Sequence, residues 1–173
     1  IGIDIKDSSH NHKNSKVDIY YDGKNLPFED NSFESVVCFE VLEHIKNPEF
    51  TITEINRVLK NNGNLLLTMP FAWFEHELPH DYQRYTENGL RNLILKKGFI
   101  INNMQKSNSA IEAIMQLISL YLISNIIPKS KFKLIFWPFI ASFVNILTFL
   151  LMWILPNDDA YYSNVIICAK KKD

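Results

Sequence analysis

Six short apolar runs recur along the chain and have the length and β-branched content of strands. They cover 1–5, 17–21, 32–39, 64–69, 99–105 and 164–170. The run at 64–69, NLLLTM, is apolar at nearly every position, which is typical of a strand covered on both faces. The pattern therefore predicts a sheet with buried central strands.

Two amphipathic stretches between these runs predict helices. Asn47 followed by Pro48 indicates a helix start, because Asn caps free N–H groups and proline needs no donor at the first position. Apolar residues then recur at helical spacing as far as Gly63, which we expect to end the helix. Thr86 is expected to cap a second helix that runs to Lys97.

Strands that alternate with helices indicate an α/β fold, a Rossmann-like and mostly parallel sheet with helices on both faces. Ligands of such sheets bind at the carboxyl ends of the strands. Asp4, Asp22, Glu40 and Pro70 all fall just past predicted strand ends. We therefore expect these four residues to line one crevice.

The charge and the cysteine content limit which binding partners and which cellular compartment are expected. The 173 residues carry 18 basic and 19 acidic side chains, so a net charge of −1 gives no overall field that would recruit nucleic acid. Cys38 and Cys168 lie in apolar stretches and suggest no disulfide framework, which favours a reduced, cytoplasmic setting. The chain opens on IGIDIK, already strand-like, so we expect at least one element to precede Ile1.

The hexapeptide FEVLEH, residues 39–44, combines two carboxylates with an imidazole. Glu40 and His44 have the i, i+4 spacing of helical metal ligands. The predicted helix starts only at Asn47, however, and no cysteine or second histidine lies close in sequence. We therefore expect no metal here. An acid/base pair of Glu40 and Glu43 is an equally weak prediction, because any two loop carboxylates look alike.

A longer pattern is more specific. The segments DGKNLPFEDNSFESVVCFEVLEHI (22–45) and INRVLKNNGNLLLTMPF (55–71) resemble the class I S-adenosylmethionine-dependent methyltransferases, in the type 11-like branch with a D-x-x-x-LPF-x-D-x-SF-x-x-V…EVLEH pattern. The stretches GFIINNM and NVIICAKK are similar to the antiparallel closing strands of that fold. The resemblance covers residues 1–106 and 161–171. We expect 1–106 and 161–173 to form the methyltransferase core.

The resemblance implies S-adenosylmethionine as cofactor, with its adenosine end near the first two strands. Asp4, with Ile5 beside it, would hold the ribose hydroxyls. Asp22 would accept a hydrogen bond from the adenine amino group, with the backbone of Gly23 and Lys24 next to the ring. From the residues alone, Asp22 and Gly23 could equally form a turn.

The resemblance also implies where the methionine end lies. Phe39 and Glu40 would flank it, while Glu43 and His44 would organise the turn into the next helix. A core position for Phe39 is the alternative.

Two departures from the family pattern stand out. The first strand and the glycine-rich loop that cradles the methionine carboxypropyl group are missing from the chain. The stretch KDSSHNHKNSK (6–16) lacks the apolar periodicity of the family's helix, which predicts a shortened or irregular connection.

The segment 70–99 carries the candidate chemistry. Its HELPHDYQRYT stretch resembles H-E-x-P-x-D-Y-x-R-Y-T segments of methyltransferases linked to bacterial surface glycans. A hydroxyl acceptor must lose a proton, for which an imidazole is suited, and positioning supplies much of the rate of methyl transfer. His76 is the first candidate base, His80 the second, and Asp81 the orienting group. The alternative is an Asp81–Arg84 pair that only holds the loop.

Residues 107–160 form an apolar helical insert between the last two strands. Leu134–Leu155 carries no charge and reaches the length of roughly 20 residues that spans a bilayer. Two crossings would carry the lysines of PKSKFK (128–133) to the far side, and Pro128 and Pro138 are expected to break the helices. These features favour an interfacial hairpin with its lysines toward anionic headgroups. A spanning hairpin, an apolar lid and a homodimer surface are the alternatives.

Together these observations predict transfer of a methyl group from S-adenosylmethionine to a small-molecule or glycan acceptor, at a hydroxyl, on a lipid-linked or membrane-proximal substrate. We expect peripheral membrane contact through 110–155, at the cytoplasmic face of the membrane. A nicotinamide-dependent oxidoreductase is disfavoured by the EVLEH run and the antiparallel last strand. A non-catalytic, membrane-associated Rossmann-like binding module is the alternative function.

Overall fold

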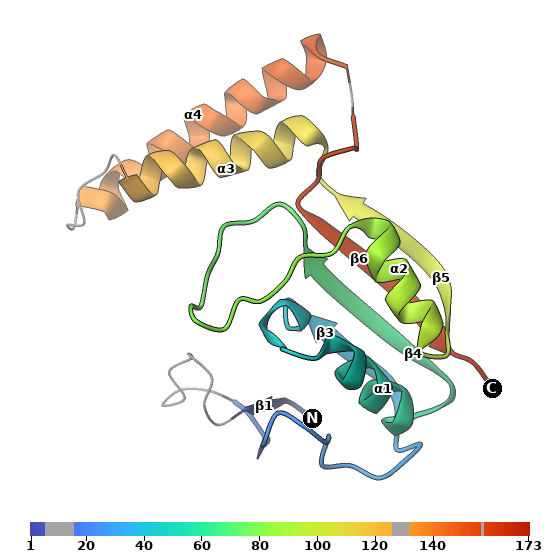
Figure 1. Cartoon of the computed structure of the whole chain (residues 1–173). Helices are drawn as coiled ribbons and strands as arrows, with labels where there is room; N and C mark the ends of the chain where they lie inside the picture. The colour runs from blue at the N-terminus through green and yellow to red at the C-terminus, as the bar shows by residue number, and fades with distance from the viewer. Residues whose placement is uncertain (6–15, 126–131, 157) are drawn as a thin grey trace. The chain divides into compact units, whose positions relative to one another are not determined.

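The computed structural model describes residues 1–5, 16–125, 132–156 and 158–173 (Figure 1). Its contacts divide the chain into two compact units. The first, here called the sheet unit, comprises Ile1–Met69, Glu75–Gln105 and Ile166–Asp173. The second, the hairpin unit, comprises Pro70–Phe74 and Lys106–Val165. The connection predicted for 6–16 lies, except for Lys16, outside the described residues.

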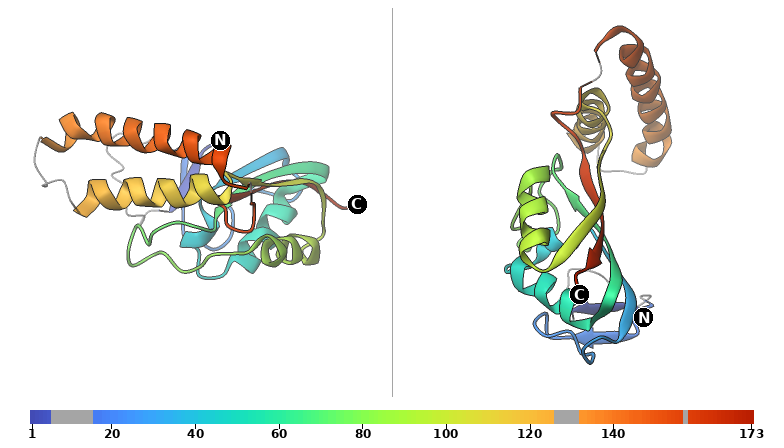
Figure 2. Two further views of the ribbon diagram at one scale, coloured as in Figure 1. Left: turned by 90° about the horizontal axis from the view of Figure 1, so that it is seen from above. Right: turned by 90° about the vertical axis from the view of Figure 1, so that its right-hand side faces the viewer.

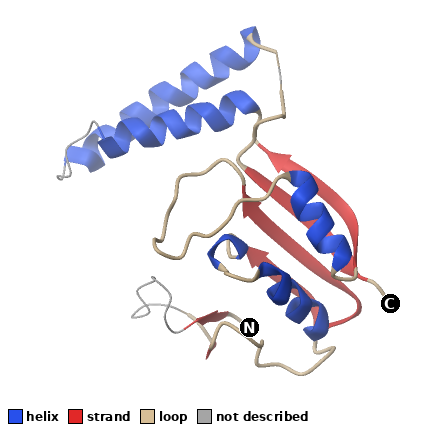
Figure 3. Cartoon of the chain, in the orientation of Figure 1, coloured by secondary structure: helices blue, strands red, loops and turns tan. Residues whose placement is uncertain are grey.

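The larger sheet of the fold has four strands in the order β3-β4-β6-β5 (Figure 3). Its strands are β3 (Phe33–Phe39), β4 (Leu59–Pro70), β5 (Phe99–Ser107) and β6 (Asn164–Lys171). β3 and β4 are parallel. The Ser163 N–H donates to the Ser107 carbonyl and the Lys172 N–H donates to the Gly98 carbonyl, so β6 runs antiparallel to β5. The predicted antiparallel last strand is therefore present.

Two further strands form a separate parallel pair. β1 (Ile3–Ile5) and β2 (Ile19–Tyr21) align Asp4 with Tyr20. The segment that follows β2 is tied to the next helix, because the Leu26 N–H donates to Glu54 Oε2 at 2.9 Å.

Two helices of the sheet unit begin at the predicted caps. α1 (Pro48–Val58) starts after Asn47, whose side chain accepts a hydrogen bond from the backbone of the first turn at 3.2 Å. α2 (Glu87–Lys96) starts after Thr86, which caps its helix in the same way at 3.2 Å. Both helices lie on the same face of the sheet (Figure 2, right).

The first helix ends earlier than the sequence predicts. It stops at Val58, and Leu59 already pairs with Phe33. Gly63 is not the helix stop but a buried position within β4, where a Cβ atom would come within 2.8 Å of the Lys60 carbonyl oxygen. The glycine therefore serves a close backbone approach, at the point where the register between β3 and β4 shifts.

The sheet buries one face under these helices. The side chains of alternate positions on β4 and β6 are fully buried: Leu65, Leu67, Met69, Val165, Ile167 and Ala169. On the other face, Val37 and its register partner Leu66 are 60% and 36% exposed. Within the described part of the sheet unit, helices thus cover one face, where the sequence predicts helices on both.

The hairpin unit contains two apolar helices that run side by side in opposite directions (Figure 1). They are α3 (Ala110–Asn125) and α4 (Phe132–Ile154). Pro138 lies inside α4 and does not end it, so the expected break at this residue is wrong. Proline removes one backbone hydrogen bond, which a helix of 23 residues retains enough others to tolerate. Pro128 lies outside the described residues.

Candidate active site

The site is built on the turn that follows β3. A short 3-10 helix, η2 (Leu42–His44), carries the chain from β3 toward α1. Glu40 precedes this turn at φ +49, and its carboxylate accepts a hydrogen bond from the Thr68 hydroxyl at 2.6 Å. Glu77 also has a positive φ, of 54. Glutamate seldom adopts this left-handed conformation, which costs of order 1–3 kcal/mol and concentrates at functional sites.

The loop after β4 is fastened to this turn. The Tyr82 N–H donates to the Glu43 carbonyl at 2.8 Å. The side-chain amide of Gln83 donates to the carbonyls of Leu42 and Ile45 at 2.8 and 2.7 Å. These bonds fix the histidine-bearing segment 76–85 against η2, because they join groups of the loop to three backbone carbonyls of the turn.

His76, Asp81 and Arg84 form a connected group within this loop. Asp81 Oδ2 lies 3.3 Å from His76 Nδ1 and accepts the His76 backbone N–H at 3.0 Å. Arg84 donates to both carboxylate oxygens of Asp81, one of them at 2.7 Å. The hydrogen bond from Arg84 lowers the pKa of Asp81 to about 2. The structure therefore contains both the predicted His76–Asp81 pair and the Asp81–Arg84 pair.

His80 has a different neighbour. Its Nδ1 lies 3.0 Å from the Tyr82 hydroxyl, and its side chain is exposed. The backbone carbonyl of His80 instead lies 3.0 Å from His44 Nδ1. The two candidate bases therefore occupy distinct surroundings.

Glu43 is the feature that the sequence reasoning missed. Its side chain is fully buried, and within the described residues neither carboxylate oxygen accepts a hydrogen bond. Burial raises the pKa of Glu43 to about 7. The neighbouring His44 Nε2 lies 3.8 Å from Glu43 Oε1. The sequence predicts only that Glu43 and His44 shape the turn.

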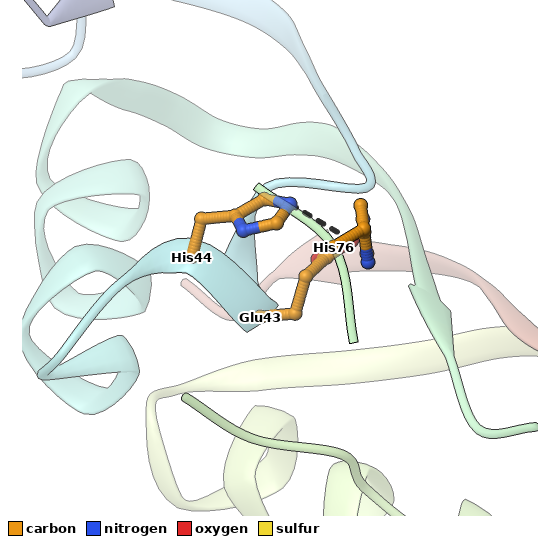
Figure 4. A group of neighbouring side chains, drawn as sticks. All are labelled: Glu43, His44 and His76. Carbon is orange, nitrogen blue, oxygen red and sulfur yellow. Dashed lines mark ion pairs between the residues drawn. The ribbon is translucent and has the colours of Figure 1, made fainter. Parts of the chain in front are cut away.

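His76 completes a cluster with these two residues (Figure 4). The rings of His44 and His76 meet edge to face, with centroids 4.7 Å apart. One potential ligand atom from each of Glu43, His44 and His76 lies within 4.8 Å of the others. The sequence hides this cluster because His76 comes from a loop beyond α1 and β4, far from the FEVLEH stretch.

The predicted adenosine-binding residues gather at the ends of β1 and β2. Asp22 Oδ1 accepts the Lys24 N–H at 2.9 Å, which makes the turn that the sequence offers as an alternative. Gly23 has φ +75, and a Cβ atom there would lie 3.2 Å from the Ile5 side chain. Asp22, Gly23 and Ile5 therefore lie together, in a backbone conformation that glycine favours.

Tyr21 lies close enough to Cys38 of β3, and to Asp22 and Asp4, for their charges to act on its hydroxyl. Burial raises the pKa of Tyr21, and the nearby Cys38, Asp22 and Asp4 raise it further. Asp22 and Glu40 follow their strands directly, as predicted, whereas Asp4 lies within β1 and Pro70 is the last residue of β4. The expectation that all four come just past strand ends is thus wrong for two, because β1 continues through Asp4 to Ile5 and β4 extends one residue beyond its apolar run.

Phe39 is not a core residue, since it is 47% exposed at the end of β3. It lies beside Glu40 at the carboxyl end of β3, the end at which ligands of such sheets bind. The residues present suit the adenosine end of the predicted cofactor. The glycine-rich loop that would hold its carboxypropyl end is not among the 173 residues.

Comparison with known sequences supports the predicted resemblance to methyltransferases for the first part of the chain. Residues 1–67 match the methyltransferase-domain family. An uncharacterised protein of Methanocaldococcus jannaschii is 48% identical over 44 residues, which are 25% of this chain and 19% of that protein. The chain therefore spans only a small part of this relative.

Solved structures share the fold. The [4+2]-cyclase SpnF matches with a TM-score of 0.53 at 19% identity, over 89% of this chain and 56% of the cyclase. A protein from Bacillus halodurans with a provisional assignment as a methyltransferase gives 0.52 at 18% identity, over 91% and 78%. An S-adenosylmethionine-dependent methyltransferase of Thermotoga maritima gives 0.51 at 17%, over 89% and 63%.

These likenesses confirm the predicted Rossmann-like α/β fold. At such identities they speak for the fold alone, and the cyclase among them illustrates that one fold can host different reactions. The resemblance drawn from residues 22–45 is confirmed by the family match, which contains that segment.

Proposed function

We propose that this chain takes part in methyl transfer to a hydroxyl of a small or glycan-type acceptor. Residues 1–67 match the methyltransferase-domain family, and the fold is similar to that of a protein provisionally assigned as a methyltransferase. The observation that carries this proposal is the position of the His76–Asp81–Arg84 group, which is fastened to the turn after β3.

S-adenosylmethionine, when bound, supplies a methyl group on a sulfonium that any well-placed nucleophile can attack in line. Asp22 and Asp4 suit its hydroxyl and amino donors, because carboxylates accept such hydrogen bonds. Gly23 is exposed, and the lack of a side chain lets its backbone lie close to Ile5. Phe39 and Glu40 would border the methionine end.

His76 would accept the proton of the acceptor hydroxyl. Asp81 remains ionised because its pKa is held near 2 by Arg84, so it can orient the ring and stabilise a protonated imidazole. His80, beside Tyr82, is the second candidate for this role.

The sheet face that carries Val37 and Leu66 is exposed, although parallel sheets normally have both faces covered. The chain spans only part of the proteins it matches, so the cofactor test below uses the natural protein that contains it.

The hairpin unit supports a lipid-linked or membrane-proximal acceptor. Ile135–Ile154 has a mean hydropathy of 2.0, and only 6% of it is buried. A groove with a volume of about 400 Å³ lies in the same unit. Apolar and aromatic side chains line it: Phe74, Ile114, Leu117, Ile118, Tyr121 and Tyr161. Such a groove suits a hydrocarbon chain.

The same apolar surface supports peripheral contact at the cytoplasmic face of a membrane as part of the proposal. A helix that is apolar on all sides must be covered, and the lysines at 129, 131 and 133 favour an anionic lipid surface. A homodimer that buries α4 is the alternative cover.

Calorimetry with S-adenosylhomocysteine tests the cofactor half of the proposal. We expect Glu40→Ala to weaken binding about tenfold and His76→Ala to leave it unchanged. Transfer of label from methyl-labelled S-adenosylmethionine to a bacterial lipid-linked glycan extract tests the other half, where His76→Ala should lower turnover. Absence of S-adenosylhomocysteine binding by the natural protein would rule out the methyltransferase and favour a non-catalytic binding module.

A further inference from the structure

The cluster of Glu43, His44 and His76 has the composition of a metal centre (Figure 4). We propose that these three residues bind a divalent first-row metal ion, such as Mn²⁺ or Zn²⁺. Two imidazoles and a carboxylate from two separate segments converge on one point, as in mixed nitrogen and oxygen sites for such ions.

His44 is oriented for ligation. Its Nδ1 lies 3.0 Å from the His80 backbone carbonyl, and a carbonyl oxygen can only accept, so Nδ1 carries the proton. The lone pair therefore belongs to Nε2, which lies 3.8 Å from Glu43 Oε1 and 3.9 Å from Glu77 Oε2. Metal-bound histidines usually donate their second ring nitrogen to a carbonyl or carboxylate in this way.

His76 has the matching arrangement. Its Nδ1 faces Asp81 Oδ2 at 3.3 Å, and the Asp81 side chain is only 2% exposed and held by Arg84. The carboxylate accepts from Nδ1, which assigns Nε2 as the ligand atom. Both histidines thus have a fixed partner on Nδ1.

Glu43 supplies an independent observation. Its side chain is fully buried, and among the described residues no donor reaches either oxygen. A buried carboxylate that accepts no hydrogen bond is costly, and a bound cation is a direct way to satisfy it. Glu77, near His44 Nε2, is placed to supply a further oxygen.

The distances between the three potential ligand atoms suit one metal ion after the atoms move slightly closer together. Ligand atoms bound at about 2.1 Å from one ion lie roughly 3.0–3.4 Å from their neighbours. The three atoms here lie within 4.8 Å of one another, so they must close by about 1–2 Å. His76 is 31% exposed and lies on a loop, so its side chain has room for this movement.

Three or four protein ligands leave coordination positions open for an oxygen of the acceptor. This consequence rests on the proposed function. The ion would stabilise the alkoxide as the O–H proton departs to His80 or solvent. The oxygen then forms its bond to the methyl carbon, and the electrons of the broken C–S bond stay on sulfur. When the ion is bound, Nε2 of His76 is a ligand, so His80, the second candidate base, takes the proton in its place; His76 is the base only in the metal-free protein.

Titration of the metal-free natural protein, purified without a histidine tag, tests the site directly. MnCl₂ and ZnCl₂ are followed by calorimetry and CoCl₂ by its visible absorption. We expect one ion per chain, with affinity lowered at least about tenfold in His44→Ala and in His76→Ala. Glu43→Gln, which is close to isosteric, should lower it as well if the fold is retained by circular dichroism.

His80→Ala is the matched control, because it keeps the backbone carbonyl that faces His44. Its metal affinity should equal that of the unaltered protein. The proposal would be overturned if the unaltered protein bound no metal. It would also be overturned if His44→Ala and His76→Ala bound the metal as tightly as the unaltered protein. A loss in His80→Ala as large as in His76→Ala would place the ion elsewhere. Metal titration needs neither cofactor nor acceptor, so its failure is distinguishable from failure of S-adenosylhomocysteine binding.

Discussion

Asp81 contacts His76 at two points, since its Oδ2 accepts the His76 backbone N–H at 3.0 Å and lies 3.3 Å from the ring Nδ1. One carboxylate therefore fixes both the position and the rotation of this imidazole. Because Arg84 also binds Asp81, the orientation of His76 depends on an ion pair within the loop.

Asp81→Asn should weaken that arrangement in two measurable ways. The buried ion pair with Arg84 is lost, and because Arg84 is partly exposed we expect the free energy of unfolding to fall by about 1–3 kcal/mol. Metal affinity should fall about tenfold, as the ring loses its fixed partner. Urea denaturation and CoCl₂ titration measure these effects.

Asp30→Asn provides the control for this change. Asp30 also pairs with an arginine, Arg57, but its side chain is 68% exposed. Its replacement should alter the free energy of unfolding by less than about 1 kcal/mol and leave the metal affinity unchanged. Equal losses in both variants would show that Asp81 has no special role.

Gly23→Ala tests the turn beside the predicted adenosine site. The residue has φ +75, and the new Cβ would lie 3.2 Å from Ile5. We expect a loss of about 1–2 kcal/mol in the free energy of unfolding and weaker binding of S-adenosylhomocysteine. Gly2→Ala is the matched control, since its nearest contact is 3.7 Å, and it should affect neither measurement.

Glu54 should make stability depend on pH. The hydrogen bond from Arg57, aided by the Leu26 N–H, lowers the pKa of Glu54 in the folded chain. The folded state therefore binds this proton less readily than the unfolded state, so the stabilisation is present at neutral pH. It is lost as the pH falls below the usual glutamate value of about 4.3 and through the lowered pKa.

Denaturation of Glu54→Gln at neutral and acid pH measures this contribution. The variant should be less stable near pH 7, and the difference from the unaltered chain should shrink toward about pH 3. Glu49→Gln, on the exposed side of the same helix, is the control and should change the free energy of unfolding by less than about 1 kcal/mol. A Glu54→Gln difference that stays constant with pH would contradict the assignment.

Charged substitutions on α4 test the apolar surface. Phe139 and Phe143 are 71% and 68% exposed, so Phe139→Glu with Phe143→Glu should fold normally but lose co-sedimentation with anionic phospholipid vesicles. Leu95→Glu, at an exposed apolar position on α2, is the control. Retained vesicle binding by the double variant, or a change only in its oligomeric state, would favour a protein partner for α4.

The sequence predicts the architecture because its signals are local. Caps at Asn47 and Thr86 and the apolar runs each act within a few residues, and all of them appear in the structure. Gly63 misleads for a physical reason: a glycine that ends a helix and one that permits a close backbone approach look the same in sequence.

The candidate site was only partly accessible from sequence. Asp81 lies close to His76 along the chain, so their pairing could be predicted. The meeting of His76 with Glu43 and His44 depends on how the loop folds back over η2, through long-range bonds such as those of Gln83. The sequence pattern therefore predicts only a turn at FEVLEH. In the structure, two residues of this turn lie beside His76 and provide part of a potential metal site.

The hydrogen bonds of Gln83 also bear on the rate of the proposed methyl transfer. A loop that is tied to its neighbouring turn by main-chain carbonyls is in place before any acceptor arrives. The histidine-bearing segment would then form one side of the acceptor site before binding. No slow loop closure, and no entropic cost of ordering the loop, would be added to each round of methyl transfer. Differences in rate between acceptors should therefore reflect how well each acceptor fits against this segment.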